Sequence, residues 1–288
     1  MPFMTTSSES DGSVVSKGEI MLENLQQRLL SGSIAFVLFL IPLSLGGVWF
    51  QVTAGLLAVG VVCELMRMYR LQPSSIEGIL TMFATLSLAL PLQGYMSFLQ
   101  ADASVMIYTL FIFILMGSTL LQPNRYSYTE VVFPIASSFY VGIGFHSLIL
   151  AREASMDMAL LALLIVWSTD IGAYFVGMRF GNRKLLPEIS PNKTIEGGIG
   201  GIVASIIVVG IFMLFRQDVT KPYGVLLTLI FVAFLSACGQ VGDLVESAIK
   251  RRFGVKDSGN IIPGHGGLFD RFDSTIFVLP VMHILGFF

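Results

Sequence analysis

The sequence predicts an all-α, polytopic integral membrane protein with about nine transmembrane helices and a polar cavity that faces the cytoplasm. Of its 288 residues, 54% are hydrophobic and only 12% are charged, which is about half the charge of a soluble domain of this size. The apolar residues form long runs, and the charged residues gather in two segments of the second half. The alternating pattern of an outer-membrane barrel is absent.

The composition divides the chain into three parts. Residues 1–25 are polar and Ser-rich without an apolar core, which predicts a disordered cytoplasmic tail and neither a signal peptide nor a span. Residues 26–150 are expected to form the N-terminal transmembrane helices. Residues 151–288 are expected to form the C-terminal catalytic transmembrane region, with a signature at 247–273.

The predicted spans follow from runs of apolar residues, because a helix needs about 20 of them to cross the hydrocarbon core. The first two runs are nearly fused, and Gly46-Gly47 marks a hairpin between them. Pro91 and Gln93 shorten the third run. The candidate spans are residues 30–45, 47–65, 76–93, 104–121, 129–149, 157–178, 196–215, 222–241 and 273–288.

The distribution of basic residues predicts the orientation. With a cytoplasmic N-terminus, 14 of the 17 Lys and Arg residues fall on the cytoplasmic side, as the positive-inside rule requires. Loops 179–195 and 242–272 then face the cytoplasm, and the C-terminus lies outside. Cys63 and Cys238 lie in apolar segments and are expected to be small packing residues, not a disulfide.

The first charged segment joins the eighth and ninth predicted helices. Asp243, Ser247 and Lys250 share one helix face by their i, i+4, i+7 spacing. Asp270 and Asp273 share a face at the start of the last helix. Asp243, Asp270 and Asp273 therefore predict a metal site at two adjacent helix ends. Hard carboxylate oxygens favour Mg²⁺, alone or with a second cation.

The second charged segment begins inside a predicted span. Asp170 follows Ser168 and Thr169 in an apolar helix, which indicates a polar, water-filled pocket. The alternative is a structural Asp that pairs with a neighbouring helix. Gly197 and Gly201 form a small-residue motif that is typical of helix packing.

A helix start follows this span. The run from Ser190 to Thr194 reads as an N-cap region, with Glu196 in the first turn of the next helix. A helix N-terminus that carries Lys193 and Thr194 is also a good seat for a phosphate. In the other charged segment, His265 lies between two glycines and is a candidate phosphate ligand, proton carrier or turn residue.

These segments carry a dense pattern. Its positions are Ser247, Ile249, Lys250, Arg251, Lys256, Asp257, Gly259, Ile262, Pro263, His265, Gly266, Gly267, Leu268, Asp270, Arg271, Phe272 and Asp273. The pattern resembles the signature of the phosphatidate cytidylyltransferase (CDP-diacylglycerol synthase) family. The blocks at 170–177, 190–197 and 242–243 are also similar to that family. One departure is Asn192, where the family usually has a second Lys.

The resemblance implies the reaction CTP + phosphatidate → CDP-diacylglycerol + pyrophosphate, a step of phospholipid biosynthesis that needs a divalent metal. It also implies a homodimer in the membrane, which would be the inner membrane in a bacterium. The implied catalytic residues are Asp243, Lys250, Arg251, His265, Asp270 and Asp273. The implied substrate-binding residues are Asp170, Ser190, Lys193, Thr194, Glu196, Ser247, Lys256, Gly266, Gly267 and Arg271.

The residue types fit this chemistry. A lipid phosphate monoester is already anionic at neutral pH, since its second pKa is about 6, and it needs no strong general base. The obstacle is repulsion between the lipid phosphate and the nucleotide, which metals, Lys and Arg neutralise. We expect Lys250 and Arg251 to hold the triphosphate and Lys193 to seat the phosphatidate headgroup.

Two other functions are compatible with parts of the pattern. A CTP-dependent lipid kinase would transfer the γ-phosphoryl group, but the full pattern up to Asp273 is the mark of the cytidylyltransferases. An ion-coupled transporter would use Asp170 and Asp243 as coupling carboxylates. Transporters often show repeated halves, and the sequence shows no such repeat.

Overall fold

The computed structural model describes residues 17–95, 98, 100, 102–121, 126–221, 223–261 and 266–288, with side chains from residue 30 onward apart from Leu121. Within these residues, helices dominate and one short hairpin is present. The elements are α1 (Lys17–Leu45), α2 (Gly47–Met68), α3 (Ile76–Ala89), η1 (Leu92–Gly94), α4 (Ala103–Leu121), α5 (Tyr128–Ala154), α6 (Met156–Phe180), β1 (Lys184–Leu186), β2 (Ser190–Thr194), α7 (Ile195–Phe215), η2 (Gln217–Thr220), α8 (Gly224–Arg252) and α9 (Phe269–Ile284).

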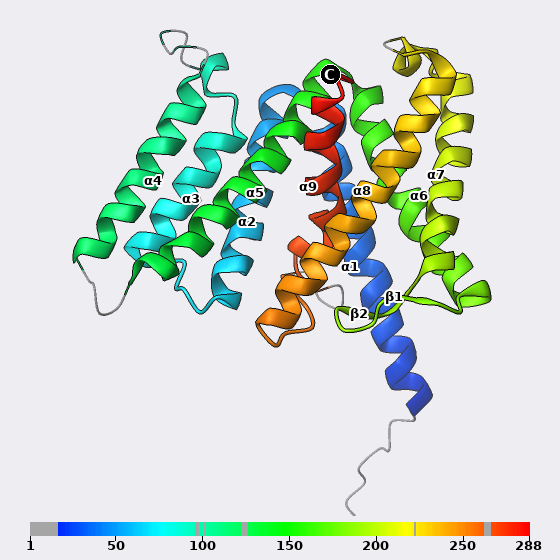
Figure 1. Cartoon of the computed structure of the whole chain (residues 1–288), viewed down its shortest axis with the longest axis horizontal. Coiled ribbons are helices and arrows are strands. Elements are labelled where there is room, and N and C mark those ends of the chain that lie inside the picture. Colours follow the sequence, from blue (N-terminus) through cyan, green and yellow to red (C-terminus); the bar gives the residue numbers. More distant parts are fainter. Residues whose placement is uncertain are drawn as a thin grey trace, which may run out of the picture.

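The helices form two groups that α9 joins (Figure 1). Helices α2 to α5 pack together on one side, and α6, α7 and α8 pack on the other. Helix α9 lies between the groups and contacts both α5 and α8. Large side chains such as Phe145, Leu161 and Phe269 are fully buried in the main core. The position of α9 therefore depends on both halves of the chain.

The structure confirms an all-α, multi-pass membrane protein. Six described helices, α2 and α4 to α8, are long and apolar enough to cross a membrane. The apolar part of α1 and helix α3 are shorter. Large apolar side chains on the outer surface, such as Leu214, Phe215 and Leu226, are at least 74% exposed, as expected for groups that face lipid. All nine predicted segments are helical, but a nine-span topology stays a prediction.

Some boundaries differ from those predicted. Helix α1 begins at Lys17, inside the segment 1–25 that was expected to be a disordered tail, because the residues after Lys17 are mainly strong helix formers. Residues 1–16 lie outside the described part. The break after α1 falls at Gly46, as expected, where φ is +67°. The guanidinium of Arg152 fills the space that a Cβ at Gly46 would need.

The hairpin of β1 and β2 was not predicted. Its two strands pair antiparallel, with Lys184 opposite Thr194 and Leu186 opposite Ser190. The Glu196 carboxylate accepts hydrogen bonds at 3.1 Å from the main-chain N–H groups of residues 182 and 183. This contact ties the end of α6 to the first turn of α7. Both strands are too short for a periodic pattern to reveal them.

Candidate functional site

The two charged segments lie at the same end of the molecule (Figure 1). The β1–β2 hairpin, the C-terminal end of α8 and the N-terminal end of α9 are neighbours there. The Nε of Arg251 on α8 donates a hydrogen bond of 3.3 Å to the carbonyl of Ile189 in the hairpin. The structure thus brings together the two segments that the sequence singled out.

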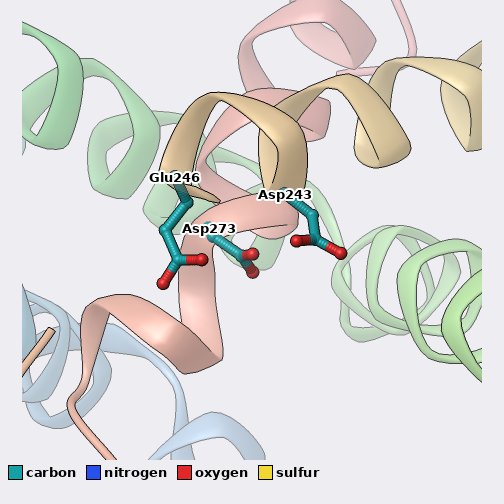
Figure 2. A group of neighbouring side chains, drawn as sticks. All are labelled: Asp243, Glu246 and Asp273. Carbon is teal, nitrogen blue, oxygen red and sulfur yellow. The ribbon is translucent and has the colours of Figure 1, made fainter. Parts of the chain in front are cut away.

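Three carboxylates converge where α8 meets α9. Asp243 and Glu246 come from α8, Asp273 comes from α9, and one oxygen of each lies within 4.8 Å of the others. Figure 2 shows Asp273 between the other two, with all three side chains pointing into the same space. Gly242 permits this convergence, because a Cβ there would lie 2.7 Å from the Cβ of Phe277 on α9.

Glu246 is the most enclosed member of this acidic cluster, which we define as Asp243, Glu246 and Asp273. The residue is 2% exposed, and its Oε2 lies 2.7 Å from Nζ of Lys250. Its Oε1 is buried and has no hydrogen-bond partner among the described residues. Leaving a buried oxygen unsatisfied is costly, so this atom indicates a ligand position.

Asp270 lies outside the acidic cluster. The predicted metal set of Asp243, Asp270 and Asp273 had included it. Its carboxylate accepts hydrogen bonds from Nζ of Lys250 at 2.9 Å and from the main-chain N–H of Gly267 at 2.8 Å. The N–H of Ser258 donates to it at 3.0 Å. Because α9 begins at Phe269, Asp270 satisfies donors at the helix start. Glu246, three residues after Asp243, takes the third place in the cluster.

Lys250 and Ser247 follow Asp243 along α8 as their spacing predicted, but they have different partners. The hydroxyl of Ser247 lies 3.5 Å from Oδ1 of Asp243, at the limit of a hydrogen bond. The ammonium of Lys250 bridges Glu246 and Asp270. Lys250 therefore links α8 to the start of α9 and neutralises two carboxylates.

A cavity of about 470 Å³ opens beside the cluster between α6, α7, α8 and the hairpin. Asp170, Lys193 and Asp243 line it, together with Tyr174 and Gln240. The ammonium of Lys193 lies 2.5 Å from Oδ2 of Asp243. Asp170 thus lines a cavity that also contains one of the cluster carboxylates, and the water-filled character of this cavity stays a prediction.

The helix start that borders this cavity is capped as predicted. The Oγ1 of Thr194 accepts a hydrogen bond of 3.1 Å from the N–H of Gly197. Gly197 and Gly201 also pack as predicted, since a Cβ at either would lie under 3.0 Å from a carbonyl oxygen of α6, on Ala173 and on Thr169 respectively. Ser190 lies at the start of β2.

The other signature residues lie on the loop and on the surface. Lys256 and Arg271 are exposed. Gly266 has a φ of +81°, a conformation that glycine adopts without strain, and Gly267 is buried. His265 lies outside the described residues.

Glu64 on α2 is a buried residue that the sequence analysis missed. It is 1% exposed, and its carboxylate accepts hydrogen bonds from the N–H groups of Leu268 and Phe269, both at 2.9 Å. The hydroxyl of Ser258 donates to it at 2.8 Å. The signal was available, because an ionisable residue inside an apolar helix is costly and is usually functional.

Comparisons with known proteins identify the family of the chain. A profile of the cytidylyltransferase family matches residues 26–288. A protein named phosphatidate cytidylyltransferase from Bacillus subtilis (strain 168) is 41% identical over 267 residues, which cover 91% of this chain and 97% of that relative. One of the same name from Staphylococcus haemolyticus (strain JCSC1435) is 43% identical over 263 residues, with 91% and 98% covered. The chain therefore belongs to the cytidylyltransferase family.

Proposed function

We propose that this chain catalyses the reaction CTP + phosphatidate → CDP-diacylglycerol + pyrophosphate. An oxygen of the lipid phosphate attacks the α-phosphorus of CTP, and the bond from that phosphorus to the β-phosphate oxygen breaks. The observation that carries the proposal is the acidic cluster, whose Asp243 pairs with Lys193 and lines a cavity between apolar helices. The family match and the names of the relatives support the same reaction.

The acidic cluster fits a divalent cation. Its three carboxylates offer hard oxygen ligands within 4.8 Å of one another, and the buried Oε1 of Glu246 has no partner among the described residues. We propose that Asp243, Glu246 and Asp273 hold Mg²⁺, in place of the set with Asp270. When bound, such a cation neutralises phosphate charge and polarises the phosphoryl group under attack.

Lys193 is the cation best placed for a substrate phosphate. It lines the cavity and pairs with Asp243, and the apolar wall of the cavity includes Ala173, Met178 and Leu185. An apolar wall next to an ammonium suits a phospholipid headgroup and its glycerol. We propose that Lys193 seats phosphatidate. Lys250 holds Glu246 and Asp270 in place, so it orients carboxylates and does not bind the triphosphate directly.

The remaining cationic groups suit the nucleotide. Arg251 donates a hydrogen bond to the carbonyl of Ile189 in the hairpin. Lys256 is exposed in the loop that joins α8 to α9, and Arg271 is exposed in the first turn of α9. A triphosphate needs several such charge-assisted contacts. We propose that these residues attract CTP to the cytoplasmic mouth of the cavity. A homodimer is an expectation of the family resemblance.

Isotope transfer tests the reaction. The purified full-length chain in detergent micelles should move label from [α-³²P]CTP into a lipid product in the presence of phosphatidate and Mg²⁺, and no label from [γ-³²P]CTP. Lipid labelled only from [γ-³²P]CTP would identify a lipid kinase instead. Absence of both products, with Mg²⁺ binding intact, would contradict the proposed reaction and favour a transporter.

Cysteine labelling tests the proposed orientation. Asn182 and Asn260 are exposed in the two charged segments, whereas Ser258 is 6% exposed and suits no such probe. In a chain with Cys63 and Cys238 replaced by Ala, a Cys at position 182 or 260 should react with a membrane-impermeant maleimide only in opened cells. Reaction in intact cells would place the cavity on the opposite side.

A further inference from the structure

We infer that Glu64 is a positioning residue, which fixes the first turn of α9 and thereby places Asp273 in the acidic cluster. This inference rests on the proposed function. Glu64 lies on α2, far in sequence from the charged segments, yet its carboxylate accepts hydrogen bonds from their loop and helix start. Among the described residues, Glu64 belongs neither to the lining of the cavity nor to the acidic cluster, so its action is indirect.

The contacts of Glu64 complete the start of α9. The first N–H groups of a helix have no partner inside the helix. At α9, the N–H groups of Leu268 and Phe269 donate to Glu64, and the N–H of Gly267 donates to Asp270. Leu268 itself provides no side-chain cap. A carboxylate from α2 thus sets where α9 begins, one turn before Asp273.

Ser258 shows that Glu64 and Asp270 act on the loop together. Its N–H donates to Asp270 at 3.0 Å, while its hydroxyl donates to Glu64 at 2.8 Å. A single loop residue therefore connects both carboxylates. Because Lys250 also binds Asp270 and Glu246, a continuous chain of polar contacts runs from α2 to the acidic cluster.

The close approach of the Glu64 carboxylate explains why two positions of the loop are glycine. A Cβ at Gly259 or at Gly267 would clash with the Glu64 carboxylate. Main chain and carboxylate approach each other this closely only where no side chain intervenes. A carboxylate is also the group that the site requires, since its three hydrogen-bond partners among the described residues are all donors and an amide would turn its NH₂ toward one of them.

The test compares variants of the full-length chain purified in detergent. We would measure kcat, KM for each substrate, melting temperature, and Mn²⁺ affinity by electron paramagnetic resonance. Glu64→Gln should lower kcat and Mn²⁺ affinity by about 10- to 100-fold, the usual effect of losing a group that orients ligands. Both KM values should change by less than about threefold. Gly259→Ala, which alters the same contact from the loop side, should reproduce this pattern.

Two controls separate positioning from general stability. Glu77→Gln makes the same chemical change at a carboxylate outside this network and should leave kcat unchanged. Leu115→Ala removes a fully buried side chain from a separate core cluster, and should lower the melting temperature without lowering kcat per folded molecule. The double variant of Glu64→Gln with Gly259→Ala should lose no more kcat or Mn²⁺ affinity than the less active of the two single variants. The effects do not add, because both substitutions disrupt the same contact.

The inference fails if Glu64→Gln retains wild-type kcat and Mn²⁺ affinity. It also fails if Leu115→Ala lowers the melting temperature as much as Glu64→Gln does and lowers kcat by the same factor. If Glu64→Gln does not fold, Gly259→Ala decides by the same measurements. A wild-type chain without cytidylyl transfer would overturn the proposed function alone, because Mn²⁺ affinity still reports on Glu64.

Discussion

The α6–α7 pair and the α8–α9 pair border the site, and different forces hold them. Helices α6 and α7 approach through glycines: a Cβ at Gly172 would lie 2.9 Å from the carbonyl oxygen of Gly200, and one at Gly201 would lie 2.7 Å from that of Thr169. Near the site, α8 and α9 are joined by Lys250, which pairs with Glu246 and Asp270. Glycine packing holds the first pair, whereas the second pair adds a charged contact to its own close packing at Gly242.

This difference has chemical consequences. Packed glycines hold two main chains at one separation whatever ions are present. The stability of a charged contact in a protein interior depends on the neighbouring charges, and the loss of one partner is strongly destabilising. We therefore expect α6–α7 to act as a rigid wall and α8–α9 to respond to the cation and to phosphate.

The largest expected effect is at the acidic cluster. Asp243→Asn or Asp273→Asn should lower turnover by roughly 10³-fold or more, because a lost ligand removes several kcal/mol of transition-state stabilisation. Turnover at saturating Mg²⁺ and Mn²⁺ affinity would be measured. Asp270→Asn should keep more Mn²⁺ affinity than either. Equal losses in all three variants would restore Asp270 to the metal set.

The next effect concerns Lys193 on β2, just before α7, which contacts Asp243 on α8. Losing a charge-assisted contact costs about 1.5–3 kcal/mol, or roughly 10- to 150-fold. Lys193→Ala should therefore raise the apparent KM for phosphatidate, measured as surface fraction in mixed micelles, with little change in the KM for CTP. A defect mainly against CTP would assign Lys193 to the nucleotide.

A smaller effect on activity is expected within the glycine-packed pair. Gly201→Ala places a methyl group against the Thr169 carbonyl, and such overpacking costs about 1–3 kcal/mol. The melting temperature in detergent should fall while kcat per folded molecule stays the same. Loss of kcat at an unchanged melting temperature would show that α6–α7 also takes part in the chemistry.

The smallest effect is expected at the far end of α7. Lys221 pairs with Asp218 at 2.6 Å on the exposed surface, where its hydrogen bond and charge lower the pKa of Asp218. Exposed pairs of this kind contribute little to stability. Lys221→Ala should leave both turnover and melting temperature unchanged, and any clear loss of turnover would reveal an unexpected link to the site.

The sequence predicted the helices well because most apolar runs are long, as in the six described helices of spanning length, and several end at a clear signal. Gly46 ends α1, and α3 ends at Ala89 before Pro91. It also predicted the Thr194 cap, whose pattern is local. The β1–β2 hairpin was missed because strands of three and five residues show no usable period.

The site was predicted in part, for a geometric reason. Spacing along one helix placed Asp243 and Lys250 on the same face, but it gave no information on how α9 meets α8. Whether Glu246 or Asp270 joins Asp273 depends on that packing, which Gly242 sets. Glu64 stands out as an ionisable residue in an apolar helix, but it lies 194 to 205 residues before its partners, so no local pattern could identify them.

The long separation between Glu64 and its partners has a consequence for biosynthesis. Helix α2 leaves the ribosome early, whereas Leu268 and Phe269 are made near the end of the chain. Until they arrive, Glu64 lacks all three of the donors that later surround it. A C-terminal fragment of residues 99–288 begins after α1, α2 and α3 and would insert its helices without this anchor. Co-expression of residues 1–98 with residues 99–288 should then restore activity that the second piece alone lacks.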